Sequence, residues 1–335
     1  MNPDNSHPSA RLLTDCVSVV VPVYNETAVL PAFYQRVSQV LASINRPYEL
    51  IFVNDGSSDG SLALLKTLRE QDKRVGIVDL SRNYGKEVAL SAGLDCARGA
   101  AIVIIDADLQ DPPELIPELI LHWQQGYDVV AARRIERKGE TWLKKATAFV
   151  FYRVMRALSP IQIPADTGDF RLLSRRAVEA LRQLREQHRF MKGLFVWIGY
   201  PQTTIFYRRD PRQGGQTKWN YLRLWNFALE GITSFSIAPL KLASYVGLLA
   251  SLVAFVYALI IIWKTLAFGE PVRGYPSLMV VVLFLGGIQL LSLGIIGEYL
   301  GRIFNETKQR PLYFLNNHEP AEFYNDPNDF DSSSP

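Results

Sequence analysis

Two aspartates separated by one residue, Asp106 and Asp108, directly follow an apolar run and are the residues best suited to bind a metal cation. In an extended segment, residues i and i+2 project to the same side, so both carboxylates would face one ligand. Mg²⁺ is typically bound through one or two carboxylates together with substrate phosphates. Two carboxylates in this arrangement therefore suit Mg²⁺ or Mn²⁺. A helix-capping turn before Pro112 is the alternative interpretation, but it explains Asp111 rather than all three acids.

The alternation of apolar runs and helical patterns predicts the framework that positions these acids. Continuous runs rich in β-branched residues are typical of strands buried on both faces, and they lie at Val17–Val23, Glu49–Val53, Val75–Leu80, Ala101–Ile105 and Tyr127–Ala131. Helical patterns lie between them, at Glu26–Ile44, Gly60–Gln71, Lys86–Ala97 and Pro113–Gln124. This alternation predicts an α/β domain with a mostly parallel sheet and helices on both faces.

Polar segments follow four of the predicted strands, at Pro22–Glu26, Asn54–Ser58, Ser81–Gly85 and Asp106–Asp111. In sheets of this kind, ligands bind beyond the carboxyl ends of the strands. We therefore expect the four segments to meet at one edge of the sheet and to form the site. Lys86 opens a predicted helix whose backbone N–H groups suit an anion. A solvated surface lysine is the alternative.

Two uncharged stretches, Leu242–Trp263 and Gly274–Gly297, are each long enough for a membrane-spanning helix of about 20 residues. Buried helices of this length normally show a polar stripe, and these stretches do not. The ten residues between them contain Gly269 and Pro271 and predict a hairpin turn. Small residues allow membrane helices to pack closely, so we expect a homo-oligomer, with a tetramer as one option, from the glycines Gly247, Gly286, Gly287 and Gly294.

Basic residues lie mainly on the outer sides of the two predicted spans. Six precede the first span and three follow the second, whereas the turn has only Lys264 and Arg273. The positive-inside rule then predicts that the N-terminal domain and both termini are cytoplasmic, at the inner (plasma) membrane. Glu298, near the cytoplasmic end of the second span, is expected to pair with Arg302 one turn later.

These patterns divide the chain into five parts. We expect a disordered polar N-terminus at residues 1–15, the α/β domain at 16–218, an amphipathic helix at 219–237, the hairpin at 238–300 and a tail at 301–335 that is disordered from Asn316 onward. The amphipathic helix would lie on the membrane surface or pack against the core. Net charge is only +3, and we expect no nucleic-acid partner. The cysteines have no spacing typical of a zinc site.

Four segments in order resemble the motifs of family 2 inverting glycosyltransferases. They are VVVPVYNE (Val19–Glu26), VNDGSSDGS (Val53–Ser61), IDADLQDPPE (Ile105–Glu114) and TGDFRLLSRRAVE (Thr167–Glu179). The last segment and the two spans resemble the polyprenyl-phosphate branch, which includes dolichol-phosphate mannose synthase and bactoprenol glucosyltransferase. The resemblance implies a GT-A nucleotide-binding fold, a divalent metal, and transfer of one sugar from a nucleotide-sugar donor to a polyisoprenyl phosphate such as undecaprenyl phosphate.

The resemblance also assigns residues to the donor site. Asp55 would bind the base or ribose, and Asn54 stands where many relatives have aspartate. Gln110 would be a further metal ligand beside Asp106 and Asp108. The nucleotide pocket would be lined by Pro22, Tyr24 and Glu26, with Lys86 and Asp106 also contacting the donor. For Asp55 a plain turn around Gly56 is the alternative, and for Tyr24 simple packing.

Basic residues would bind the acceptor phosphate and the diphosphate. Arg133 and Arg134 follow the fifth predicted strand, and the resemblance places a basic residue there beside the acceptor, for which we favour Arg133. The alternative is charge placed near anionic lipid headgroups. A glycine-containing segment suits a lid over the diphosphate and carries Arg209, Arg212 and Lys218. Its cations also fit simple membrane topology.

Asp169 in TGDFR is the expected catalytic acid, because the resemblance places that acid in this segment. We expect TGDFR to be a loop or turn that reaches back toward the sheet edge. A phosphate monoester is mostly ionised at neutral pH, so Asp169 would position the acceptor or orient Arg171 or Arg133 rather than take a proton. Asp166 is the nearby competitor, and a turn-forming aspartate beside Gly168 is the other alternative.

Three other functions are weaker fits to the sequence. A processive polysaccharide synthase would carry a QxxRW motif and more spans. A small-molecule transporter would need more than two spans and charges inside them. A non-catalytic membrane scaffold for nucleotide sugars or lipids does not explain the acidic motifs. Among donors we favour UDP-glucose, with GDP-mannose as the main alternative.

Overall fold

The computed structural model describes residues 13–134, 167–207, 238–268 and 274–322. These residues fall into two compact units, which we describe separately. The first is an α/β unit that ends at residue 207 in the described chain and resumes at Pro311. The second contains two long helices.

The α/β unit is built on an eight-stranded mixed sheet in the order β7-β5-β6-β4-β1-β2-β3-β8. Its central strands β4, β1, β2 and β3 are all parallel to one another, as predicted. β6 is antiparallel to both of its neighbours, and β8 is antiparallel to β3. The strands are β1 Leu13–Val23, β2 Tyr48–Asn54, β3 Val75–Leu80, β4 Gly99–Ile104, β5 Val129–Arg134, β6 Thr167–Ser174, β7 Gln202–Tyr207 and β8 Leu315–Glu319.

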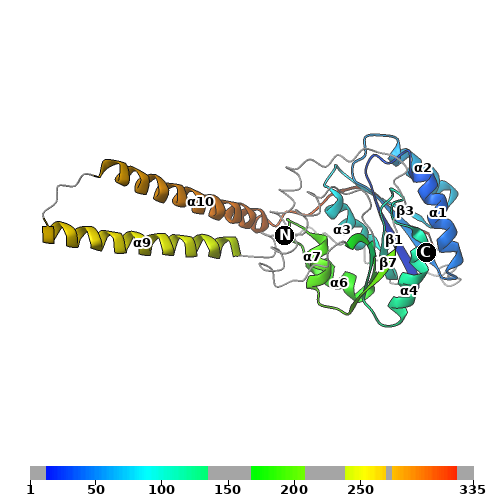
Figure 1. Ribbon diagram of the computed structural model, residues 1–335. Helices are drawn as coiled ribbons and strands as arrows, with labels where there is room; N and C mark the ends of the chain where they lie inside the picture. The colour runs from blue at the N-terminus through cyan, green and yellow to red at the C-terminus, as the bar shows by residue number, and fades with distance from the viewer. Residues whose placement is uncertain (1–12, 135–166, 208–237, 269–273, 323–335) are drawn as a thin grey trace, which may run out of the picture. The chain divides into compact units, whose positions relative to one another are not determined.

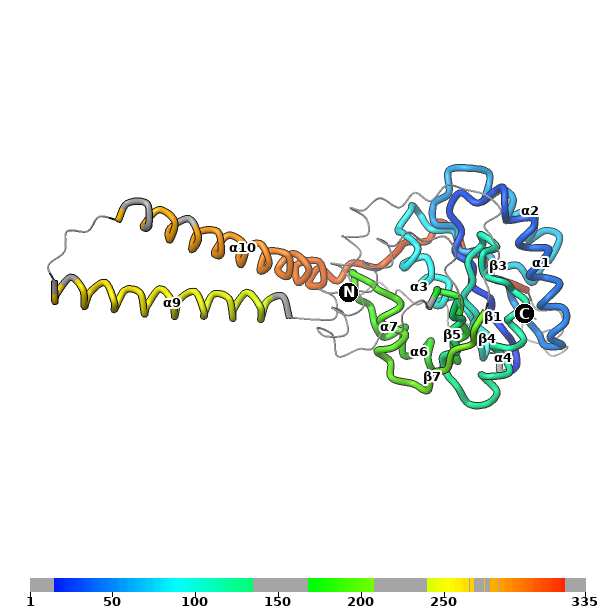
Figure 2. The backbone as a smooth tube through the Cα atoms, viewed as in Figure 1, coloured from blue at the N-terminus to red at the C-terminus, as the bar shows by residue number. Residues whose placement is uncertain are grey.

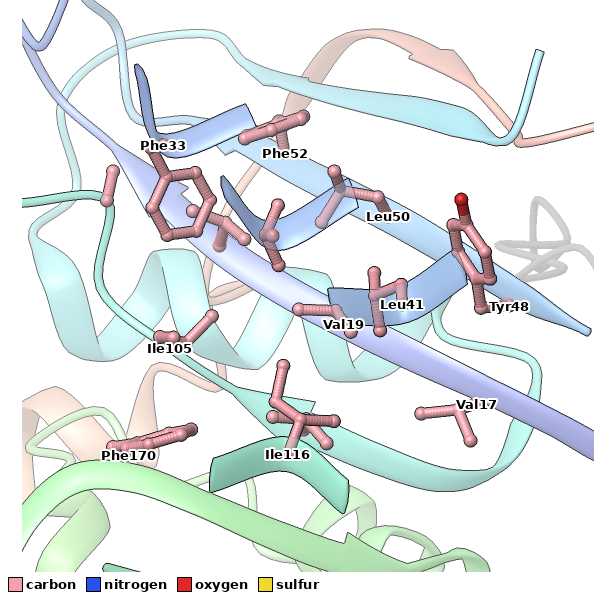
Figure 3. Close-up of a cluster of buried hydrophobic side chains, with 14 of the residues drawn as sticks. Val17, Val19, Phe33, Leu41, Tyr48, Leu50, Phe52, Ile105, Ile116 and Phe170 are labelled. Atoms are coloured by element: carbon pink, nitrogen blue, oxygen red, sulfur yellow. The ribbon is translucent and has the colours of Figure 1, made fainter. Parts of the chain in front are cut away.

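Helices cover both faces of this sheet (Figure 1). One face is covered by α1 (Leu30–Ser43), α2 (Ser61–Gln71), the short 3-10 turn η1 (Pro113–Leu115) and α4 (Ile116–Gln124); the other by α3 (Lys86–Cys96) and α6 (Arg175–Gln183), with α7 at Met191–Trp197. The apolar stripe of α1 includes Phe33 and Leu41, which pack with Val19, Leu50 and Phe52 of the sheet (Figure 3). This apolar burial is the main stabilising contribution to the core.

Gly93 lets α3 pack closely against the centre of the sheet. A Cβ added at Gly93 would lie 2.3 Å from a methyl of Val20 and 2.9 Å from a methyl of Val53. Any larger side chain would push α3 away from β1 and β2. The glycine therefore fixes where the first residues of α3, including Lys86, lie relative to the strand ends.

The TGDFR segment is a strand rather than the predicted loop. Thr167–Ser174 forms β6 between β4 and β5. Phe170 and Leu172 are fully buried in the core that α1 and α4 cover. A strand between two neighbours satisfies both sides of its backbone, and alternate apolar residues fill the core. The expected loop was therefore wrong.

The expected disorder was wrong for the start of the tail, since Leu315–Glu319 forms the edge strand β8 beside β3 (Figure 2). The tail beyond residue 322 lies outside the described residues. Its side chains are polar, but an edge strand is held by backbone pairing and needs no apolar face. Arg69 forms ion pairs with Glu319 at 3.1 Å and with Glu322 at 3.2 Å. Arg98 donates to the Ala321 carbonyl at 2.5 Å.

The second unit consists of α9 (Ala238–Phe268) and α10 (Tyr275–Thr307), which contact each other. The stretches Leu240–Lys264 and Leu278–Thr307 are long and apolar enough to cross a membrane by length and composition. Arg302 pairs with Glu298 at 3.1 Å, as predicted. A Cβ added at any of the four glycines of the oligomer prediction would meet no atom within 4 Å. The predicted amphipathic helix at 219–237 lies outside the described residues.

Candidate functional site

Three charged side chains meet where β4 and β6 run side by side. Ile104, the last residue of β4, pairs with Arg171 of antiparallel β6. Asp106 follows β4 and Asp169 precedes Arg171, so both acids lie at this end of the two strands. The Lys86 ammonium at the start of α3 donates to Asp106 Oδ2 at 2.7 Å and to Asp169 Oδ2 at 2.5 Å. Three of the predicted site residues are therefore in direct contact.

The two acids of this cluster differ in their electrostatics. Burial raises the pKa of Asp106, and the Lys86 cation offsets this only in part. Burial also acts to raise the pKa of Asp169, but Lys86, Lys192 and Arg171 outweigh it and lower that pKa to about 2. In each acid Oδ1 is buried and accepts no hydrogen bond within the described residues. An orphaned carboxylate oxygen of this kind is unusual and suits a ligand that brings positive charge.

The proposed metal ligands lie on a turn and not on the extended segment that the spacing suggested. β4 ends at Ile104, and Leu109 has a left-handed φ of 57°. The Asp108 carboxylate accepts the backbone N–H of the buried Gln110 at 3.1 Å. Within the described residues, no three His, Cys, Asp or Glu side chains form a group that could hold a metal. The described part of the chain thus offers at most two carboxylates here, which fits a cation completed by substrate phosphates.

Asp55 anchors the loop that carries Lys86. Its side chain is buried, and its two oxygens accept the backbone N–H groups of Tyr84 at 2.7 Å and Gly85 at 3.0 Å. Gly56 has a φ of +64°, and a Cβ there would lie 2.5 Å from the Arg82–Asn83 peptide. The loop at the end of β2 (the second loop, Asn54–Ser58) and the loop after β3 (the third loop, Ser81–Gly85) are therefore bound to each other. This gives Asp55 a structural role besides the predicted contact with the donor.

The loop at the end of β1 (the first loop, Pro22–Glu26) is bound to the second loop through Asn25, a residue that the sequence analysis did not single out. Asn25 adopts a φ of 56°, and its side-chain oxygen accepts the N–H groups of Ser58 at 2.8 Å and Asp59 at 3.3 Å. Asparagine tolerates this left-handed conformation better than most residues, so an Asn two residues after the end of a strand was the available signal. Tyr24 beside it is 49% exposed, and Pro22 lies within β1 opposite Val53.

Asn54 is a packing residue in this structure. It is buried, donates to Asp79 Oδ1 at 2.6 Å and accepts the Ser57 N–H at 3.2 Å. Both polar ends of the amide are thus used inside the protein. The backbone N–H of Glu26 donates to Ser61 Oγ at 3.0 Å, which ties the other end of the first loop to α2.

The predicted cations are only partly described. Arg133 lies at the end of β5, opposite Thr167 of β6, with its guanidinium 5.8 Å from the ring centre of Phe206 in β7. Arg134 is the last residue of β5. Arg209, Arg212 and Lys218 lie outside the described residues, so the predicted lid stays a prediction.

Glu87 is a buried acid that the sequence analysis missed, because a glutamate in the first turn of a helix is typical of a solvated position. Its Oε2 accepts the backbone N–H of Met191 at the start of α7, at 2.9 Å. Burial and the nearby charge of Asp169 raise the pKa of Glu87 to about 7. This carboxyl therefore ionises close to neutral pH.

Glu87→Gln should raise stability at pH 8 and change it little at pH 5. The folded protein binds this proton up to about pH 7, whereas the unfolded chain releases it near 4.5, so stability falls as pH rises between these values. The effect is at most about 3 kcal/mol, and glutamine keeps the acceptor for Met191. Melting temperatures of both proteins at the two pH values test it.

The control for this prediction is Glu114→Gln. Glu114 pairs with Arg36 at 2.6 Å, and its pKa is lowered despite partial burial. Its replacement should therefore give no stabilisation at pH 8. Equal shifts for Glu87→Gln at pH 5 and pH 8 would contradict the assignment.

Comparison with known proteins gives consistent similarities over most of the chain. A family model described as glycosyl transferase family 2 matches residues 18–182, and one described as GtrB C-terminal hairpin matches residues 238–303. An uncharacterized glycosyltransferase of Synechocystis sp. is 54% identical over 299 residues, covering 89% of this chain and 94% of that protein. The bactoprenol glucosyl transferase of Shigella phage SfV is 46% identical over 301 residues, covering 90% and 98%.

One solved structure with a similar sheet is a glucosyl-3-phosphoglycerate synthase of Mycobacterium tuberculosis, crystallised with Mn²⁺, uridine diphosphate and phosphoglyceric acid. The TM-score is 0.48 at 19% identity, over 65% of this chain and 76% of that one. The predicted fold class, a GT-A-like mostly parallel sheet followed by two apolar helices, is confirmed.

Proposed function

Because the chain belongs to the family 2 glycosyltransferases, we propose that it transfers a single hexose from a nucleotide sugar to a polyisoprenyl phosphate, with inversion at the sugar carbon. The observation that carries this proposal is the contact of Lys86 with Asp106 and Asp169 at the carboxyl end of the sheet. We propose glucose from UDP-glucose as the sugar, which is supported by relatives named bactoprenol glucosyl transferase at 46% identity.

In this proposal Asp169 acts as a fixed negative charge and not as a base. Its pKa of about 2 makes it a weak proton acceptor at neutral pH. The acceptor needs little help, since the second pKa of a phosphate monoester is about 6. Asp169 would instead hold Lys86 and keep the acceptor phosphate on the correct side of the donor sugar. Arg133 would bind that phosphate through paired hydrogen bonds.

We propose that Mg²⁺ or Mn²⁺ binds at Asp106 and Asp108, with Gln110 as a further ligand. The orphaned Oδ1 of Asp106 supports this, because a buried carboxylate oxygen without a donor favours a cation. When bound, the cation would supply positive charge to the departing diphosphate. The loops anchored by Asp55 and Asn25 would hold the nucleotide beside it.

We further propose that α9 and α10 span the inner membrane, with the α/β unit and both termini in the cytoplasm. The distribution of basic residues around the two helices supports this orientation. Residues 219–237 would lie on the membrane surface, and the chain would form a homo-oligomer. Membrane lipids would then surround the polyisoprenyl chain of the acceptor.

The experiment that tests the proposal is a transfer assay with four labelled donors. Purified protein is incubated with undecaprenyl phosphate, Mg²⁺ and either UDP-glucose, UDP-galactose, UDP-N-acetylglucosamine or GDP-mannose. We expect labelled lipid from UDP-glucose, and none when the acceptor is omitted. Labelled lipid from GDP-mannose alone would refute glucose, and donor binding without transfer from any donor would favour the non-catalytic scaffold.

A further inference from the structure

Asp169 lies in an irregular part of the sheet. Ala131 of β5 pairs with Arg171 of β6, but the next pair joins Arg133 to Thr167. Between these pairs β5 advances by two residues and β6 by four, so β6 bulges around Asp169. A bulge leaves backbone groups without their ladder partners and re-aims side chains. On the other side β4 has already ended, at the residue opposite Arg171.

Arg171 supplies hydrogen bonds to this bulge. Its Nη2 donates to the Gly168 carbonyl at 2.8 Å and its Nε donates to the Asp169 carbonyl at 3.3 Å. The guanidinium is buried, with 3% of the residue exposed, and it lies 3.9 Å from the ring centre of Phe195 in α7. A buried cation of this kind is normally paired with a carboxylate, yet here its donors go to the backbone that carries the acid.

The stacking partner of Arg171 is itself held in place from α3. The first residue of α7, Met191, donates its N–H to Glu87 at 2.9 Å, and Ser91 of α3 lies 4.0 Å from the Met191 sulfur. Glu87 is the neighbour of Lys86, which bonds the Asp169 carboxylate. Residues of α3 therefore hold Asp169 in two ways. Glu87 holds α7, whose Phe195 stacks on Arg171, and Arg171 bonds the Asp169 backbone. Lys86 bonds the Asp169 side chain directly.

We infer that Arg171 is a positioning residue for transfer: it holds the β6 bulge in the shape that points the Asp169 carboxylate at Lys86 and Asp106. It acts through Asp169 and touches no substrate. This inference rests on the proposed function, because it assigns Arg171 to the reaction in which Asp169 takes part. A guanidinium does this better than an ammonium, since its planar fork bonds two carbonyls while its face stacks on a ring.

The test is a double-mutant cycle between Arg171→Gln and Asp169→Asn in the full-length protein. Arg171→Gln should lower kcat about fivefold or more, while the KM for the sugar donor stays within about twofold. In the Asp169→Asn background the same change should lower kcat by less than about twofold, because residues that act as a unit are not additive. Arg171→Lys should recover only part of the loss.

Arg175→Gln is the matched control. Arg175 also donates to backbone carbonyls, to Gly99 at 2.9 Å and Ala97 at 3.0 Å, but at the far end of β4. It should lower the melting temperature without changing kcat per folded molecule by more than about twofold. If Arg171→Gln does not fold, Phe195→Leu carries the same cycle, with a smaller loss that also disappears in the Asp169→Asn background.

Equal losses in both backgrounds, or no loss at all, would overturn the inference. A loss of donor affinity in Arg171→Gln would overturn it too, since that would mean direct contact with the nucleotide. Wild-type protein that fails to transfer from any donor would count against the proposed function, whereas normal wild-type transfer with an additive cycle counts only against the role of Arg171.

Discussion

Chelation with EDTA and the single change Asp108→Asn should each abolish transfer. As the bond to the sugar breaks, the diphosphate gains negative charge, and Lys86 is the cation in contact with Asp106 in the described structure. That cation is already engaged by Asp106 and Asp169. We expect a loss of at least about a thousandfold, equivalent to about 4 kcal/mol in the barrier. Transfer is measured with UDP-glucose at saturating undecaprenyl phosphate, and readdition of Mg²⁺ or Mn²⁺ should restore the wild type.

Asp111→Asn is the control for the acidic loop. Asp111 is buried three residues beyond Asp108, and its carboxylate accepts the Tyr207 hydroxyl. Asparagine keeps an acceptor at that position, so activity should stay within about fivefold of wild type. Full activity in EDTA would refute the metal proposal, and a loss in Asp111→Asn as large as in Asp108→Asn would mean that the loop is simply intolerant of change.

Asp169→Asn should lower transfer at least about tenfold, a barrier increase of roughly 1.4 kcal/mol, while nucleotide-sugar binding survives. Asparagine has the same shape but removes the charge that balances Lys86. Asp55 and Asn25 fix the backbone of the donor loops through hydrogen bonds that do not use Asp169. Steady-state transfer and equilibrium binding of the donor are measured on the same preparation.

Asp166→Asn separates the two acids of the segment. Normal turnover of Asp169→Asn together with a loss in Asp166→Asn would assign the role to Asp166. The wild-type rate should rise with pH through an apparent pKa near 6, where the acceptor phosphate ionises. A rate that instead follows an acid of the protein, and loses that dependence in Asp169→Asn, would contradict the view of Asp169 as a fixed charge.

Much of the fold could be predicted because its signals are local. Each central strand is a continuous apolar run, and Val75–Leu80 begins and ends where the sequence placed it. β6 was missed because its apolar residues Phe170, Leu172 and Leu173 form a short run after a Gly-Asp turn signal. Its strand character comes from non-local pairing with β4 and β5. β8 has no apolar pattern at all and is explained by its pairing with β3 and by the ion pairs of Arg69.

The sequence indicated which polar segments meet at one edge of the sheet, but not how their side chains connect. Parallel strands bring their carboxyl ends together, so Asp55, Lys86 and Asp106 were expected near one another. The spacing of Asp106 and Asp108 suggested an extended segment, whereas the left-handed Leu109 makes a turn. Three features depend on side chains that meet only after folding. They are the position of Lys86 between two acids, the burial of Glu87 and the hydrogen bonds of Arg171 to the β6 bulge.

The pairing of β8 with β3 has a consequence for the order in which the chain is made. Synthesis runs from the N-terminus, and domains generally fold as their residues emerge. β3 is complete by Leu80, yet its partner starts at Leu315, after both apolar helices. The outer edge of β3 therefore stays open while the two apolar helices are synthesised. An open strand edge favours pairing with other chains. A shortened protein that stops before α9 would lack β8, so the edge of β3 would stay unpaired and prone to aggregation.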